Sequence, residues 1–475
     1  MIILQARRPV SGQPVTAFGD PDVPVILRDG VLLDVDLDRF LLDLRVSGVR
    51  SRHSLRAYGY DIMTWARFLD EVRGTSLWRA SSADVAAYHR ARRHGAASAR
   101  ISAQSWNRAV AALDRLYLWA VEQELAAASP FSYRQALRHT TRGRRALVAV
   151  RNTSYERAAE RTEVCPVTLE DYVRFRDLGL RGLTSGGERR AGARDRNGMR
   201  NALFADLLVT TGLRLEEASS LLAIEIEAAL AGCVGSDAQQ IPFRLAACLT
   251  KGDRGRTIRV PRRLLHALRS YIGIERARAI EKFKARQGWR SLSDAILCRP
   301  GSRAGQLQTR IDADAPWVPM SLDRLSPDER RRLLLTDDAG VPQASAALWL
   351  TETGQPVVPN SWEVAFARAA RRCHAAGTLV SISPHQLRHT FAGQMLALLM
   401  RERGSGTAGD AHDAGGSYRL MLDEALQEVR RLLGHASLAT TYRYANRLPC
   451  NNGTADAAVE ELLRALEPLP PGGTA

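Results

Sequence analysis

Apolar side chains recur at three- and four-residue steps across residues 36–128. One such series is Leu55, Tyr58, Ile62, Trp65 and Leu69. A second, in which the small Ser105 takes one position, is Ile101, Ser105, Ala109, Ala112, Leu116 and Ala120. Since this spacing places an apolar stripe on one face of a helix, which then has to be buried, residues 36–130 are predicted to form a compact domain of about four helices. Ser81 and Ser82 signal one helix start, and Pro130 closes the last helix.

A second domain is predicted for residues 166–453, where helical and strand-like patterns alternate. Helices are expected at 168–178, 199–211 and 262–286, and short strands at 241–248 and 256–261 around a turn at 252–255. The fold class that follows is mainly α with a small antiparallel β-sheet (α+β).

The remaining segments lack a long periodic pattern. Residues 1–35 are expected to be an N-terminal arm or small strand pair, and residues 131–165 a basic linker rich in arginine. Residues 299–345, with a short helix at 327–335, and residues 404–417 are expected to be surface loops. Residues 454–475 are predicted to form a C-terminal helix and tail, because apolar residues at helical spacing precede three prolines.

The chain is strongly basic. Its 67 Lys and Arg outnumber 51 Asp and Glu, giving a formal net charge of +16 and a pI of about 10.2. This balance favours a polyanionic partner, although a merely basic soluble protein would share it.

The six cysteines form no CxxC pair, which favours reduced thiols. No stretch has the length of a signal-peptide core or membrane span, so a cytoplasmic location and no membrane partner are expected.

The run from Ser383 to Ala392 contains side chains that could bind an anion. Ser383 is a suitable N-cap, with Pro384 at the first helical position. His385 and Arg388 then lie three residues apart, so one side of the first turn can present two cations to one anion.

Several short motifs occur in a characteristic order. They are TGLRLEE with Arg214, TKGDRGR with Lys251, HQLRH at 385–389, GH at 434–435 and a tyrosine nine residues after that histidine. Together they make the chain resemble the tyrosine recombinase (phage integrase) family, over about residues 36–446. The resemblance implies a helical core-binding (SAM-like) domain at 36–130 and a catalytic domain at 166–453, forming a C-shaped clamp on double-stranded DNA. Against this family, 299–345 and 404–417 are insertions.

The arginines and histidines suit attack on a phosphodiester. Arg214 and Arg388 each offer a planar, permanently charged fork that matches phosphate oxygens. His385 and His435 can add hydrogen bonds that stabilise the pentacoordinate state. Taken singly, each has a simpler explanation, namely a helix-cap ion pair for Arg214 and structural roles for the histidines.

Lys251 is one of three lysines among the 67 basic residues, and it lies at the predicted hairpin turn. Lysine can release its proton when desolvated or near other cations, whereas arginine effectively cannot. Lys251 is therefore the candidate general acid for the departing 5′ oxygen. The alternative is an exposed turn lysine.

The nucleophile is Tyr442 or Tyr444, which point to nearly opposite sides if this segment is helical. Residue spacing alone leaves both open, and the family spacing of nine residues from His435 selects Tyr444. The resemblance also suggests supporting roles for Glu217, which would orient Arg214, and for His389.

Other ligands are not implied. An i, i+4 histidine pair can bind metal, but no carboxylate accompanies this pair and Arg388 would repel a cation. No nucleotide-binding fingerprint occurs either. We therefore expect neither metal nor cofactor. Six arginines are candidates for contacts with the DNA phosphate backbone, and a solvated charged surface is the alternative explanation. They are Arg90, Arg93, Arg100, Arg108, Arg144 and Arg145.

The resemblance implies a site-specific recombinase that cuts and rejoins DNA through a 3′-phosphotyrosyl link. It also implies a homo-oligomer, a tetramer on two DNA sites joined through the C-terminal helix. A type IB topoisomerase would use nearly the same residues, and a catalytically silent DNA-binding regulator would keep the DNA clamp without the chemistry.

Overall fold

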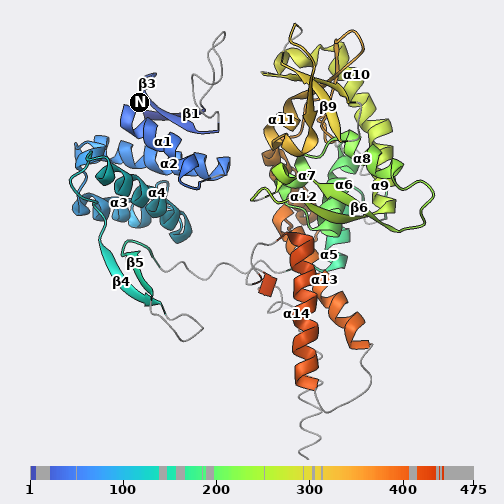
Figure 1. Cartoon of the computed structure of the whole chain (residues 1–475). Coiled ribbons are helices and arrows are strands. Elements are labelled where there is room, and N and C mark those ends of the chain that lie inside the picture. The colour runs from blue at the N-terminus through green and yellow to red at the C-terminus, as the bar shows by residue number, and fades with distance from the viewer. Residues whose placement is uncertain are drawn as a thin grey trace, which may run out of the picture. The chain divides into compact units, whose positions relative to one another are not determined.

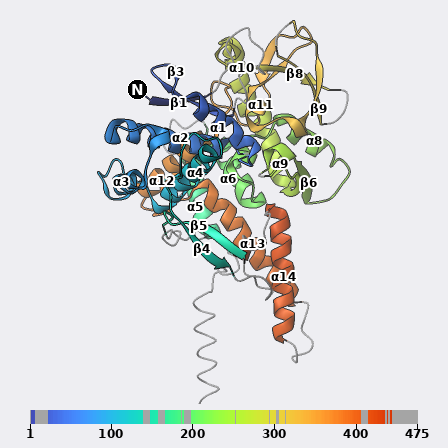
Figure 2. The same ribbon diagram turned by 60° about the vertical axis from the view of Figure 1, so that its left-hand side comes forward.

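The computed structural model describes residues 2–6, 22–49, 51–138, 147–156, 166–184, 186–188, 197–250, 252–292, 294–301, 305–311, 314–405, 414–434, 438 and 441–442. The chain divides into two compact units, Met1–Glu163 and Val164–Ala475. Figures 1 and 2 show helices predominating in both, with small sheets beside them. The predicted fold class, mainly α with small sheets, is confirmed, although one sheet is mixed rather than antiparallel.

Four helices form most of the first unit, as the apolar spacing predicts. They are α1 (Val35–Val46), α2 (Arg52–Phe68), α3 (Ser82–His94) and α4 (Ala103–Glu122). Helices α2 and α4 bury the aromatic side chains Trp65 and Trp106, and Trp65 donates from Nε1 to the Tyr117 hydroxyl at 2.8 Å. The last helix ends at Glu122, eight residues before Pro130, so the expected stop is late.

The N-terminal segment belongs to this core. Strands β1 (Ile2–Ala6), β2 (Pro24–Arg28) and β3 (Val31–Leu32) form a sheet in that order. Ile2 and Ile26 are buried with the helices, and Pro24 lies so close to Gly59 of α2 that a Cβ there would meet its Cγ at 2.7 Å. Of the two alternatives, a small strand pair is confirmed with a third short strand added, and an N-terminal arm is wrong, because these apolar residues complete the helical core.

The described parts of the predicted linker also pack on the first unit. Antiparallel strands β4 (Tyr133–Arg138) and β5 (Leu147–Asn152) form a hairpin. Beyond it, Ser154 accepts a hydrogen bond from the Trp106 indole at 2.8 Å, and the backbone of Glu156 bonds twice with the Asn107 side chain. The described parts of the predicted basic linker are therefore folded, while 139–146 and 157–165 lie outside the described ranges.

The second unit is built mainly from helices. They are α5 (Leu169–Arg174), α6 (Gly198–Thr211), α7 (Leu215–Ser219), α8 (Ala223–Ala231), α9 (Arg262–Tyr271), α10 (Ala277–Ala285), α12 (Pro359–Ala375), α13 (Pro384–Ser405) and α14 (Ala414–Leu433). Stretches of π-helix extend α5 over Phe175–Leu180 and join α9 to α10 over Ile272–Arg276. Phe204 of α6 stacks on Trp362 of α12 with ring centroids 3.6 Å apart, which fixes the centre of the core.

A hairpin of β6 (Gln240–Leu245) and β7 (Arg256–Pro261) packs beside these helices. The second strand has its predicted bounds, whereas the first ends three residues early in a short 3-10 turn over Ala247–Leu249. In β7, Ile258 and Val260 are buried and Arg259 between them is exposed.

The segment 299–345 is not a surface loop. Strands β8 (Ile296–Pro300), β9 (Gln306–Arg310), β10 (Val318–Ser321), β11 (Leu333–Thr336) and β12 (Pro342–Ser345), with helix α11 (Pro327–Arg332), form a five-stranded sheet in the order β10-β9-β8-β11-β12. Strands β8 and β11 pair in parallel and the others antiparallel. Leu307 and Leu333 are buried in a small core that also includes Leu222. The surface-loop prediction is therefore wrong, because apolar residues spread over several short strands build this core.

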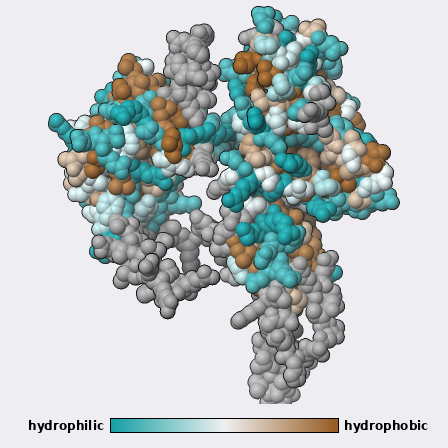
Figure 3. Space-filling model, viewed as in Figure 1, coloured by the Kyte–Doolittle hydropathy of each residue, from teal (hydrophilic) through white to brown (hydrophobic). Residues whose placement is uncertain are grey.

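The other predicted insertion, 404–417, overlaps two helices, since α13 runs to Ser405 and α14 begins at Ala414. The C-terminal segment 454–475 lies outside the described residues. None of the helices in the described ranges is long and apolar enough to cross a membrane. The face seen in Figure 3 is largely hydrophilic on both units, with scattered apolar patches.

Candidate active site

The turn between α6 and α7 places Arg214. Helix α6 ends at Thr211, and Gly212 adopts a left-handed conformation with φ of 65°. A Cβ on Gly212 would lie 2.4 Å from Cδ1 of Phe391 and 2.8 Å from Cδ2 of Leu433, so glycine is required for conformation and for close packing. Arg214 follows in extended conformation at the N-cap of α7.

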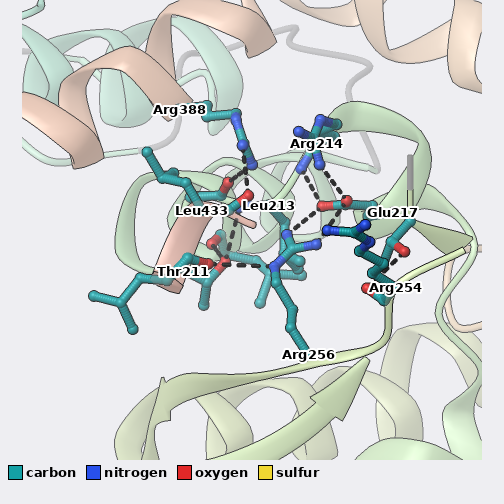
Figure 4. A network of polar contacts seen from close by, with 12 residues as sticks. Thr211, Leu213, Arg214, Glu217, Arg254, Arg256, Arg388 and Leu433 are labelled. Atoms are coloured by element: carbon teal, nitrogen blue, oxygen red, sulfur yellow. Dashed lines mark hydrogen bonds and ion pairs between the residues drawn. The ribbon is translucent and has the colours of Figure 1, made fainter. Parts of the chain in front are cut away.

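Glu217 joins Arg214 to a second arginine, Arg256 of β7. Nη1 of Arg214 lies 2.9 Å from Oε1 of Glu217, and its backbone N–H donates to Oε2 at 2.8 Å. The Arg256 fork donates to both carboxylate oxygens, at 2.9 and 2.7 Å (Figure 4). The Glu217 side chain is 1% exposed, Arg256 9% and Arg214 30%. Arg214 is thus the member of this trio that reaches the surface.

This trio keeps Glu217 ionised despite its burial. Desolvation alone would raise the pKa of the Glu217 carboxyl, but hydrogen bonds and charge from Arg256, with the charge of Arg214, bring the pKa below its ordinary value. The predicted contact between Glu217 and Arg214 is therefore present, and Arg256 is its stronger partner.

Helix α13 brings Arg388 to the same place. The Gln386 N–H donates to Ser383 Oγ at 3.3 Å, and the Gln386 side chain accepts from the Ser383 N–H at 2.9 Å, so the helix begins where predicted. Arg388 is 3% exposed, and its two terminal nitrogens donate to the carbonyls of Gly212 and of Leu433, the latter at 2.8 Å (Figure 4). These bonds fasten α13 to the α6–α7 turn and to the end of α14.

His385 and His389 stand one turn apart on α13. Their Nε2 atoms are 2.9 Å apart and the rings meet edge to face. Burial, helped by the charges of Arg388 and Arg214, lowers the pKa of His385. Within the described part of the chain, no group of three or more His, Cys, Asp or Glu could hold a metal ion.

The end of α14 completes the described site. Arg256 Nε donates to the carbonyl of Leu432 at 3.2 Å. Gly434 follows with φ of 64°, and a Cβ there would lie 2.9 Å from Cδ of Arg256. Of the six predicted catalytic residues, the structure brings together Arg214, His385 and Arg388. The other three, Lys251, His435 and Tyr444, lie outside the described residues, although Thr250, Gly252 and Gly434 beside the first two are described.

Tyr442, the alternative nucleophile, is bonded elsewhere. Its hydroxyl donates to the carboxylate of Asp423 on α14, and this bond raises the pKa of Tyr442. Asp423 precedes Leu433 by ten residues of helix, which is about 15 Å along the axis at 1.5 Å per residue. The hydroxyl of Tyr442 is thus held well away from the level at which Arg388 meets α14.

The predicted DNA-contacting arginines divide into two kinds. Arg90 and Arg100 are exposed. Arg93 is paired with Glu156 at 2.9 Å, and Arg108 makes two hydrogen bonds to Asp61, at 2.8 and 3.0 Å. Arg144 and Arg145 lie outside the described residues.

Sequence reasoning missed Arg256. The available signal was strand parity, because Arg256, Ile258 and Val260 share one face of β7 and the last two are plainly core residues. A cation on a core-facing side of a strand requires an anionic partner, and Glu217 supplies it.

The chain is a mainly helical protein in whose second unit Arg214, Arg256 and Arg388 gather around Glu217 and the end of α14. Residues 37–124 match the family model of the phage integrase N-terminal SAM-like domain. The first unit thus contains a domain of the phage integrase SAM-like type, as the resemblance implies for residues 36–130.

Distant likenesses exist among solved structures. The chain is similar to XerH site-specific recombinase bound to palindromic difH substrate in a post-cleavage complex, with 15% identity, 89% of this chain and 84% of that chain covered, and a TM-score of 0.44. It is also similar to a lambda integrase dimer bound to a COC' core site, with 12% identity, 87% and 77% covered, and a TM-score of 0.42. At these values the likenesses carry no argument about this chain. No curated protein matches it.

Proposed function

We propose that this protein is a tyrosine-type site-specific DNA recombinase, which cuts and rejoins double-stranded DNA through a 3′-phosphotyrosyl intermediate. The observation that carries the proposal is the convergence of Arg214, His385 and Arg388, from two helix starts far apart in sequence, beside the end of α14. The motif residues Gly434 and His435 follow that end directly.

In the proposed reaction, the oxygen of Tyr444 attacks phosphorus and the bond from phosphorus to the 5′ oxygen breaks. Lys251 gives its proton to that oxygen, and the 3′ end of the cut DNA strand is left joined to Tyr444 through a phosphotyrosyl link. The 5′ hydroxyl of a partner strand then attacks the link and releases Tyr444. Because the phosphodiester is exchanged rather than hydrolysed, the reaction consumes no ATP.

The cations stabilise charge on the phosphate oxygens during this attack. Arg214 is the most exposed residue of the trio, and its guanidinium can donate two parallel hydrogen bonds to a pair of phosphate oxygens. Each terminal nitrogen of Arg388 donates a hydrogen bond to a backbone carbonyl in this structure. A guanidinium has five N–H donors, so these two hydrogen bonds do not by themselves exclude a contact with a phosphate. His385 and His435 are proposed to add hydrogen bonds.

Tyr444 is preferred as nucleophile because the hydroxyl of Tyr442 is bound to Asp423 and its pKa is raised. A phenol held by a carboxylate is a poorer source of phenolate. This supports the family spacing from His435, which selects Tyr444.

The wider arrangement is part of the same proposal. Residues 36–130 and 166–453 are proposed as the two DNA-binding domains, joined by 131–165 and acting in the cytoplasm on the nucleoid. Residues 454–475 are proposed to dock on a neighbouring copy, giving a tetramer on two DNA sites. Deleting 454–475 should then impair pairing of two sites more than binding to one.

The function is tested with a pool of nicked duplexes of randomised sequence, from which protein–DNA adducts resistant to detergent are recovered and sequenced. Two copies of the recovered sequence on one supercoiled plasmid should yield exchanged products. Relaxation without exchange would identify a topoisomerase instead. Binding without any adduct would identify a silent regulator.

A further inference from the structure

We propose that Arg256 is a positioning residue that balances the charge of Glu217 and so leaves Arg214 with a surplus positive charge for a phosphate. This inference rests on the proposed function and gives a role to Arg256, the last residue of the TKGDRGR motif, in which only Lys251 was assigned one. It is drawn from the way one buried carboxylate is shared between two arginines.

The charges of the trio decide what Arg214 can offer. Arg214 and Glu217 alone would form a neutral pair, joined at 2.9 Å. A phosphate approaching that pair would meet as much negative as positive charge. With Arg256 bonded to the same carboxylate at 2.7 and 2.9 Å, the trio carries one net positive charge. The surplus is expressed at Arg214, because its side chain is 30% exposed whereas that of Arg256 is 9% exposed.

The hydrogen bonds of the trio explain why Glu217 is present at all. Its Oε2 accepts the backbone N–H of Arg214 and its Oε1 accepts the side chain, so Glu217 fixes both ends of that residue. A carboxylate so close to a phosphate site would repel the phosphate unless another cation neutralised it. Arg256 meets both oxygens with its fork, a geometry that lysine cannot reproduce with one nitrogen.

Arg256 also ties three segments of the site together. It lies at the start of β7, five residues after Lys251, and reaches the carbonyl of Leu432 at 3.2 Å. Gly434 packs on its Cδ, where a Cβ would lie 2.9 Å away. The hairpin, the α7 N-terminus and the end of α14 therefore share one buried guanidinium. A role limited to this mechanical link is the alternative that the experiment separates from charge balance.

The experiment compares Arg256→Met with the double variant Arg256→Met/Glu217→Gln. The double variant lacks the guanidinium link but restores one net positive charge at Arg214. Two quantities are measured: the rate of adduct formation on the nicked duplex pool at saturating DNA, and the affinity for inorganic phosphate. Arg259→Met is the matched control, because it removes the same charge from the exposed face of β7. Thermal unfolding of each variant shows whether it is folded.

We expect Arg256→Met to slow adduct formation by about 100-fold, which is the typical effect of removing one stabilising group from a phosphate or oxyanion site. The double variant should form adducts at least about tenfold faster than Arg256→Met. Phosphate affinity should follow the same order. Arg256→Lys, which keeps the charge without the fork, should stay closer to wild type than Arg256→Met does. Arg259→Met should not slow cleavage at saturating DNA.

Three results would overturn the inference: wild-type rates in folded Arg256→Met, no recovery in the double variant, or equal losses in Arg256→Lys and Arg256→Met. If Arg256→Met does not fold, the double variant is compared with wild type directly: a rate within about tenfold of wild type supports the inference, and a loss of about 100-fold overturns it. Failure of wild type to form any adduct would sink the proposed function, while the order of phosphate affinities would still decide the charge balance.

Discussion

Arg388 donates to the carbonyl of Leu433 at 2.8 Å, across 45 residues of sequence. The bond joins the first turn of α13 to the last turn of α14, where a cation also complements the negative end of the helix dipole. Arg256 reaches the preceding carbonyl, that of Leu432. Two arginines from different elements thus fix the point at which the chain enters its GH motif.

Gly212 provides a test of how tightly this junction is packed. Gly212→Ala should destabilise the second unit by about 2–4 kcal/mol, because it adds left-handed strain and overpacks Phe391 and Leu433. Gly273→Ala is the control, since its Cβ would meet nothing within 4 Å. Calorimetric unfolding of the full chain measures both. Equal transition temperatures for the two variants would show that the junction is loose.

The five-stranded sheet should depend on Arg330, whose side chain is 0% exposed and pairs with Glu225 at 2.9 Å. Arg330→Met leaves Glu225 without its cation and should cost about 3–5 kcal/mol of unfolding free energy. Arg244→Met breaks an ion pair with Asp323 in which the arginine is 75% exposed, and should cost less than about 1 kcal/mol. Chemical denaturation compares them, and a similar small cost for both would contradict the structural role of Arg330.

The partners of the buried arginines could not be predicted from the sequence. The helical domain, the α6–α7 boundary around Arg214 and the start of α13 could be predicted, because each depends on local spacing and capping. The sheet at 299–345 could not be predicted, since its strands are short and contain Pro300, Pro319 and Pro342. Helix α11 also buries Arg330, whose ionic partner Glu225 lies 105 residues away. Arg256 was missed for the same reason, because its partner Glu217 lies 39 residues away.

Exposed and paired arginines of the first unit should behave differently. Arg90→Ala and Arg100→Ala should weaken DNA binding and lower the salt dependence of affinity by about 0.9 in slope for each phosphate that the protein no longer neutralises, with little effect on folding. Arg108→Ala should instead reduce stability by about 1–3 kcal/mol, because Asp61 is buried and loses its partner. Binding titrations at several salt concentrations and thermal unfolding separate the two effects. A change in salt slope with Arg108→Ala alone would reverse this assignment.

The lowered pKa of Glu217 gives a pH test. Its folded pKa lies below the ordinary 4.5, so between the two values the unfolded chain binds more protons than the folded one. The stability that Glu217 supplies is therefore complete above pH 4.5 and is lost as pH falls through the folded value. The difference in unfolding free energy between wild type and Glu217→Gln should shrink over that range. A difference that is constant across it would mean that the carboxylate is not held ionised.

The central claim is that Tyr444 forms the covalent link to DNA. Wild type, Tyr444→Phe and Tyr442→Phe are incubated with the nicked duplex pool, and adducts are digested so that the modified peptide is identified by mass spectrometry. The account predicts adducts on Tyr444 in wild type and in Tyr442→Phe, and none in Tyr444→Phe. Adducts that persist in Tyr444→Phe and map to Tyr442 would contradict it.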